Sequence, residues 1–222
     1  MRAIVLLAWK DLVVEARTRE LLSSMSLVAF LTVVILGLAV GAEPRAAAAV
    51  TPAILWVTVA FGATLGLARS HAIEQERDAL QGILLTPVGR AEVFLGKCAA
   101  NLVLVVVLQA VVVVAATVFV NPDVGRRVPA LAAPLVLGGV GFAAVGTLLG
   151  AMTATTRLRE VLLPILLLPV VLPVIIVSLA GVGLALGGAG LGPLLGPIKL
   201  LTAYDIIFVL LGAWLFEYVV GD

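Results

Sequence analysis

Residues 98–122 read CAANLVLVVVLQAVVVVAATVFVNP and contain no charged side chain. About 20 consecutive apolar residues are enough to cross the hydrocarbon core of a bilayer as an α-helix. Of the whole chain, 63% is hydrophobic and 12% is charged, far from the composition of a soluble domain. Because the apolar run is continuous and does not alternate, it indicates a helix and not a strand of a β-barrel. The sequence therefore predicts an all-α membrane protein.

Similar runs lie on both sides of this one. Uncharged stretches cover residues 21–42, 46–68, 128–156 and 161–198, and a sixth candidate, residues 200–220, carries acids only near its two ends. The 161–198 stretch is too long for one helix, and its glycine-rich second half indicates a break. We predict one domain, residues 1–222, with six spans at about 21–42, 51–70, 97–120, 130–153, 161–182 and 201–220.

Several residues mark where helices should begin, bend or end. Thr51-Pro52 and Thr202 with Asp205 have the spacing of helix starts, and Asn121-Pro122-Asp123 is typical of a turn. Trp56 and Tyr204 would then lie near the outer ends of their spans, where aromatic residues are common. Three prolines remove backbone donors from the fifth span and predict a kinked, protein-facing helix: Pro164, Pro169 and Pro173.

The distribution of lysine and arginine predicts the orientation. With the N-terminus inside, ten of these 14 residues fall in cytoplasmic segments and four outside. We therefore expect a multi-pass protein of the bacterial inner membrane with both termini in the cytoplasm. The apolar N-terminal segment is interrupted by Lys10 and Asp11, so we expect it to be retained and not cleaved as a signal peptide.

The first 20 residues indicate an amphipathic helix on the inner membrane surface. Trp9, Leu12, Val13 and Ala16 recur at helical spacing. Their charged neighbours would face water, and these are Lys10, Asp11, Glu15, Arg17 and Arg19. Such a helix could serve as a simple anchor or take part in gating.

The loop at residues 71–97, between the second and third spans, reads HAIEQERDALQGILLTPVGRAEVFLGK. Ile73, Leu80 and Leu84 fall on one side of a short helix, and Thr86-Pro87 ends it. Joined to two spans, this helix could pass a push from a cytoplasmic partner into the membrane; an ordinary solvated loop is the alternative. The residues expected to contact an ATPase are Glu74, Glu76, Arg77, Asp78, Leu80, Gly82, Leu84, Pro87 and Arg90.

The segment E-R-D-A-L-x-G-I-L-L-T-P-V-x-R at residues 76–90, followed by Leu95-Gly96-Lys97, resembles the coupling segment of ABC-2-type permeases. More narrowly, the chain resembles heme exporter protein B, the permease of the cytochrome c maturation system. The matching features are Lys10-Asp11, Glu43-Pro44, TPAILWV at residues 51–57, Asp205 and Phe216-Glu217. The family commonly has Asp-Gly before Leu-Glu in this loop, and Asp78-Ala79-Leu80-Gln81-Gly82 departs from it.

The resemblance implies a six-helix permease that works as a homodimer with a cytoplasmic ABC ATPase. It also implies a heme-handling membrane subunit and a small membrane subunit as partners, next to a periplasmic heme chaperone. ATP hydrolysis would drive either heme export or release of the loaded chaperone. We expect heme as a possible cargo. We assign no directly bound cofactor to this chain.

Other functions fit less well. The sequence contains no G-x-x-x-x-G-K-[ST], so ATP hydrolysis is expected in a separate subunit and this chain is not expected to be an enzyme. One cysteine, Cys98, excludes an internal disulfide, and the single histidine, His71, has no companions for a metal site. An intramembrane protease would need a base beside Ser178 or Thr153. An ABC-2 permease for another amphiphilic cargo, or a scaffold that transports nothing, stays open.

Overall fold

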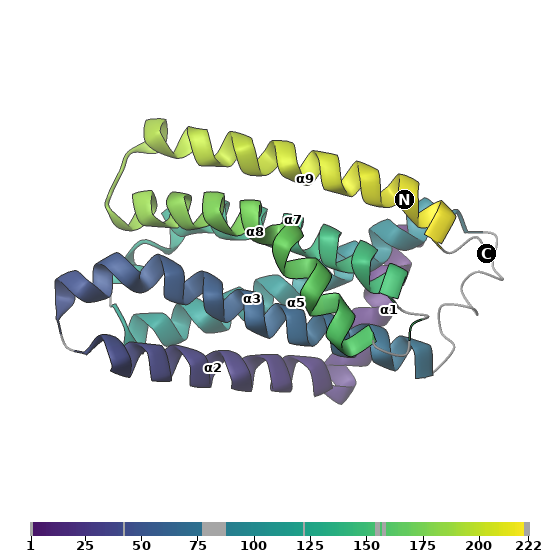
Figure 1. Ribbon diagram of the computed structural model, residues 1–222, viewed down its shortest axis with the longest axis horizontal. Helices are drawn as coiled ribbons and strands as arrows, with labels where there is room; N and C mark the ends of the chain where they lie inside the picture. The colour runs from purple at the N-terminus through teal and green to yellow at the C-terminus, as the bar shows by residue number, and fades with distance from the viewer. Residues whose placement is uncertain are drawn as a thin grey trace.

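The computed structural model describes residues 2–41, 43–76, 88–121, 123–153, 156 and 159–219, with only the backbone for residues 71–76 and 159–160. Figure 1 shows a bundle of long helices with both ends of the chain at the same end of it. The helices are α1 Arg2–Thr18, α2 Glu20–Val40, α3 Pro44–Glu76, α5 Arg90–Phe119, α6 Asp123–Arg126, α7 Val128–Thr153, α8 Arg159–Leu186 and α9 Leu191–Val219. The described residues contain no strand, so the prediction of an all-α chain is confirmed.

Six helices are long and apolar enough to cross a bilayer. They cover Glu20–Val40, Pro44–Ser70, Arg90–Phe119, Val128–Thr153, Val161–Leu186 and Leu191–Val219. Each is longer than the ~20 residues that a span requires. The chain is therefore a multi-pass membrane protein, as its apolar runs predict.

Helix α7 lies at the centre of the bundle and packs on α3, α5, α8 and α9. Glycines let its neighbours come close. A Cβ atom at Gly138 would lie 2.4 Å from the ring of Trp56 on α3, and one at Gly146 would lie 2.3 Å from Leu67 on the same helix. Small residues at helix contacts allow this approach in membranes, where no hydrophobic effect drives the helices together.

Polar side chains reinforce the contacts of α7. The Asn101 amide donates a 2.9 Å hydrogen bond to Thr147, and the Gln109 amide donates a 2.8 Å bond to the carbonyl of Leu135. The Ser178 hydroxyl of α8 donates to the carbonyl of Pro134. All three side chains are buried. Hydrogen bonds of this kind fix the register of neighbouring helices where no water is present.

Helix α8 contains Pro164, Pro169 and Pro173 and bends in its middle (Figure 1). Proline lacks the N–H group that continues a helix, and this accounts for the bend. The Tyr204 hydroxyl of α9 donates a 2.8 Å bond to the carbonyl of Val170, next to the bend. The predicted kink is present, but only one face of α8 is buried: Ile165 is 60% exposed and faces outward.

Two expected helix starts are wrong. Helix α3 begins at Pro44, and the Thr51 hydroxyl donates 2.6 Å to the carbonyl of Ala47 within the helix. Helix α9 begins at Leu191, and Thr202 likewise donates 2.8 Å to Ile198. Threonine bonds back to the preceding turn inside helices as well as capping them, so the sequence pattern alone does not separate the two roles.

The positions of Trp56 and Tyr204 follow from these longer helices. Trp56 is fully buried, and Tyr204 lies near the middle of α9, so neither belongs to an aromatic belt at the outer surface. The predicted start of the last span, at about residue 201, is wrong because it was placed after the charged residue Lys199. It is an exposed residue inside α9, where a lysine can extend its amine toward the surface along its apolar stem.

At the end of the bundle opposite the termini, α8 finishes in a left-handed turn. Gly188 has φ 76°, and its N–H donates to the carbonyl of Ala185 at 3.1 Å. The Arg127 guanidinium donates to the same carbonyl at 3.2 Å. A cation at a helix C-terminus satisfies carbonyls that have no partner within the helix. This contact ties the α6–α7 joint to the α8–α9 joint.

We expect Gly138→Ala to destabilise the bundle by about 1–3 kcal/mol, because the new methyl group would overlap the buried Trp56 ring. The measurement is thermal unfolding of the purified protein in detergent. Gly196→Ala is the matched control, since a Cβ atom there has nothing within 4 Å. Equal melting temperatures for the two variants would contradict this account of the packing.

Candidate functional site at the charged end of the bundle

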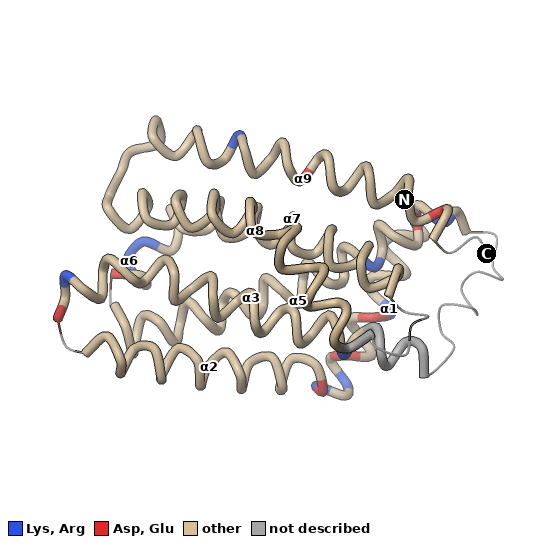
Figure 2. Tube along the Cα trace, in the orientation of Figure 1, with Lys and Arg blue, Asp and Glu red and all other residues tan. Residues whose placement is uncertain are grey.

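Charged residues gather at the two ends of the bundle, and α9 also carries charged positions along its length (Figure 2). The end that holds the termini contains α1, the start of α2, the end of α3 and the start of α5. In the sequence, the predicted coupling segment lies between the end of α3 and the start of α5, and its centre, residues 77–87, is outside the described residues. The contacts around this connection form the candidate site.

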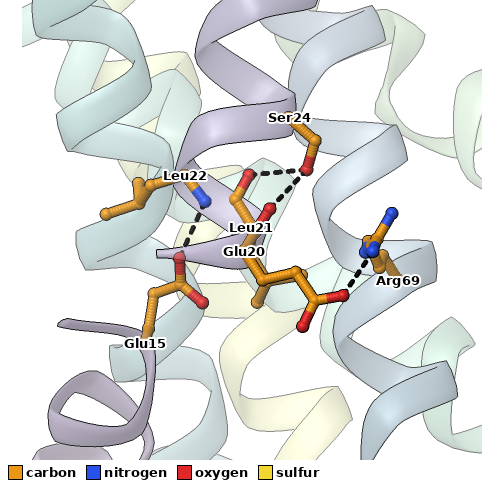
Figure 3. A network of polar contacts seen from close by, with 6 residues as sticks. All are labelled: Glu15, Glu20, Leu21, Leu22, Ser24 and Arg69. Atoms are coloured by element: carbon orange, nitrogen blue, oxygen red, sulfur yellow. Dashed lines mark hydrogen bonds and ion pairs between the residues drawn. The ribbon is translucent and has the colours of Figure 1, made fainter. Parts of the chain in front are cut away.

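Helices α1 and α2 meet in a sharp joint at Arg19. Its φ of 54° is left-handed, and its N–H donates 2.7 Å to the carbonyl of Glu15. The Glu15 carboxylate accepts the N–H of Leu22 at 2.8 Å (Figure 3). A carboxylate at the first turn of a helix accepts a hydrogen bond from an N–H group that has no partner within the helix. Its negative charge also interacts favourably with the positive end of the helix dipole.

The sequence predicts that Glu15 faces water, but the residue is buried and only 5% exposed. The reason is that the chain turns at Arg19, which folds the start of α2 over the last turn of α1. Helical periodicity within residues 2–18 carries no information about this turn. Glu15 is thus part of the joint and not of a solvated face.

The joint is also tied to α3. The Glu20 carboxylate and the Arg69 guanidinium form an ion pair (Figure 3). The Ser24 hydroxyl donates 2.6 Å to the Glu20 carbonyl and holds the first turn of α2. Arg69 is seven residues before Glu76, where the described part of α3 ends. The start of α2 is therefore connected to the helix that leads into the coupling segment.

On the far side of the coupling segment, Arg90 is the first residue of α5. Its guanidinium donates a 2.9 Å hydrogen bond to the carbonyl of Glu217, in the last turns of α9. Arginine at the C-terminal end of a helix satisfies an open carbonyl and interacts favourably with the dipole. The two flanks of the segment are thus attached to different helices: α3 to α2, and α5 to α9.

Helix α1 lies against the start of α5. A Cβ atom at Gly96 would be 2.8 Å from Cβ of Leu7 and 3.2 Å from the carbonyl of Ile4, so glycine sets this close approach. On the opposite side of α1, Val5 and Trp9 are 67% and 66% exposed. The N-terminal helix is present, but its apolar residues lie on two faces: one contacts α5 and the other is uncovered.

Of the residues expected to contact an ATPase, the structure places one side chain, that of Arg90. Glu74 and Glu76 lie on the last turns of α3, where only the backbone is described, as does His71. The others lie outside the described residues: Arg77, Asp78, Leu80, Gly82, Leu84 and Pro87. Arg69 contributes to the predicted orientation only as one of the ten cytoplasmic basic residues, and Glu20 was not predicted to belong to the site. Opposite charges at the facing ends of two consecutive spans are the signal that could have paired them.

The model of the CcmB protein family matches residues 1–220, which is nearly the whole chain. The chain belongs to the CcmB family. This is the heme exporter protein B family that the sequence resembles, a family of ABC transporter permease subunits. No curated protein matches the chain.

In this CcmB-family chain, the described contacts lie on the two flanks of the loop that is predicted to contact an ATPase. A permease subunit generally carries no catalysis of its own. The contacts described above join helices on the two sides of the predicted coupling segment.

We expect Glu15→Ala to lower the stability of the joint by about 1 kcal/mol, because the Leu22 N–H would lose its acceptor. Glu15→Gln keeps an oxygen acceptor at the same place and is the matched control. Hydrogen exchange of the amides in residues 20–24 measures the effect. Faster exchange in the alanine variant alone is the expected result, and no difference between the two variants would contradict the capping role.

Proposed function

We propose that this chain is the membrane-spanning permease subunit of the ABC transporter of cytochrome c maturation, acting as a homodimer with a separate cytoplasmic ATPase. The observation that carries the proposal is the attachment of both flanks of the coupling segment. Arg69 binds Glu20 on one side, and Arg90 binds the end of α9 on the other. A displacement of the segment would therefore move α2 and α9 together with α3 and α5.

The orientation proposed from the sequence supports this role. Ten of 14 basic residues would lie in the cytoplasm with both termini. The attached coupling segment would then face the compartment that contains ATP. The sequence has no phosphate-binding loop of its own, so the partner subunit would bind and hydrolyse the nucleotide.

The family name supports heme as the cargo. We propose either that heme itself is exported or that a heme-loaded periplasmic chaperone is released, driven by the partner ATPase. A heme-handling membrane subunit and a small membrane subunit of the same system would complete the assembly. In this proposal heme is a cargo and not a resident cofactor of the chain.

The first test is co-purification of the tagged chain with the ABC ATPase that the proposal assigns to the same system. Leu84, which lies outside the described residues, is on the apolar side of the predicted loop helix. We expect Leu84→Glu to reduce bound ATPase at least tenfold and to leave the amount of membrane-inserted permease unchanged. The reason is that a carboxylate would replace an apolar contact with the partner.

Leu191→Glu is the matched control, because it introduces the same charge at the opposite end of the bundle, where Leu191 is 82% exposed. This variant should retain the ATPase. Undiminished binding in Leu84→Glu would overturn the assignment of the coupling segment. If the wild-type chain binds the ATPase but its presence changes neither the rate of ATP hydrolysis nor the release of chaperone, the result would favour a scaffold.

The second test separates binding from transmission. An exposed ion pair contributes about 1 kcal/mol or less to stability, so breaking Glu20–Arg69 should leave the complex assembled. We expect Glu20→Arg to lower the amount of heme-loaded chaperone released per ATP hydrolysed severalfold. Exchanging the two charges, with Glu20→Arg and Arg69→Glu together, should restore most of it. A single variant as productive as wild type would show that this pair transmits nothing.

A further inference from the structure

Asp205 lies in the middle of α9, fourteen residues after Leu191 and fourteen before Val219. At 1.5 Å per residue, it is about 21 Å from either end of the helix. An ionisable residue at this depth in a membrane span is rare and costly, and it usually marks a functional site. The contacts of the coupling segment do not involve Asp205.

The carboxyl group is enclosed. Asp205 is 6% exposed, and it lies against Gly141 of α7. A Cβ atom at Gly141 would be 2.9 Å from Oδ1 of Asp205, 3.1 Å from Val174 and 3.2 Å from Tyr204. The group thus occupies the space that the missing glycine side chain leaves between α7, α8 and α9.

No side chain among the described residues donates a hydrogen bond to either oxygen of this carboxyl group, and the donor that faces it is the backbone N–H of Gly141. The neighbouring Tyr204 hydroxyl does not bind it, since it donates to the carbonyl of Val170 on α8. The buried amides of α5 do not bind it either, because Asn101 and Gln109 donate to α7. The acid therefore lacks the side-chain donors and cations that usually stabilise a buried carboxylate, and one backbone N–H is the polar group left to it.

The ion pairs found among the described helices do not include Asp205. Residues 128–153 of α7 and residues 161–186 of α8 contain no titratable side chain. From α5, the titratable neighbour is Cys98, and from α9 itself it is Tyr204. Lys97 precedes Cys98 on α5 and has interactions of its own. On α9, Lys199 is exposed on the outer side of the helix.

We infer that Asp205 is a proton-binding site in the middle of the membrane, and that its carboxyl group is a neutral acid while α9 rests on α7. A neutral acid avoids the cost of an unpaired charge in a dry interior. If α9 moves away from α7 and water enters, the acid transfers its proton to water and leaves a hydrated carboxylate. The ligand of this site is therefore a proton, and its release reports separation of the two helices.

Infrared difference spectroscopy tests this inference on the full-length chain in vesicles of phosphatidylethanolamine and phosphatidylglycerol at neutral pH. We expect the difference spectrum between wild type and Asp205→Asn to contain the C=O band of a protonated carboxylic acid. This band lies at higher frequency than the amide bands and shifts in heavy water. Bands of an ionised carboxylate in its place would overturn the inference. Asp123→Asn is the control, because Asp123 is exposed and should lose carboxylate bands.

A second variant keeps the test independent of how well Asp205→Asn folds. Gly141→Ala retains the acid but places a methyl group against its oxygen. We expect it to shift the same protonated C=O band, and a shift confined to carboxylate bands would contradict the inference. The spectra require no ATPase, so their outcome is separate from that of the proposed transport role.

Discussion

The close approach of α7 to four other helices is the contact on which the rest of the bundle depends. In hydrocarbon, helices associate through van der Waals contact and hydrogen bonds, because lipid tails are as apolar as the side chains. Glycine at 138 and 146 admits side chains of α3, and glycine at 141 admits Asp205 of α9. The same closeness brings the amides of Asn101 and Gln109 within hydrogen-bond distance of α7. A bulkier α7 would lose both kinds of contact.

At the end of the bundle that holds the termini, polar contacts join helices in addition to apolar packing such as that of Leu7 on Gly96. Glu15, Glu20 and Arg90 each connect one helix to the end of another. These contacts lie at helix ends, where open N–H and C=O groups are available and where charge complements the helix dipole. A tightly packed middle with polar joints at one end suits a protein in which force enters at that end. The proposed permease role uses this division.

Much of the fold could be predicted from the sequence because membrane spans are set by long uncharged runs, and all six appear. The boundaries were harder. Lys199 looked like an end of a span but lies inside α9, and Thr51 and Thr202 looked like caps but bond within their helices. The hydrogen bonds and ion pairs of the candidate site could not be predicted from local sequence patterns. Glu15, for example, is buried only because the chain turns at Arg19. The family could be recognised because its features extend over nearly the whole chain.

The connections at the end opposite the termini have a consequence for recognition. The turns after α2 and α8 are a few residues long, and α6 is a single turn of helix closed against Asn121, whose side chain accepts the N–H of Asp123. Arg127 lies against Gly188 and donates to the carbonyl of Ala185, and it thereby joins the α6–α7 connection to the α8–α9 connection. Little of the part of the chain that the structure describes projects beyond the helices on this side. A partner that bound this end of the bundle would therefore contact short turns and the ends of helices, and not an extended loop.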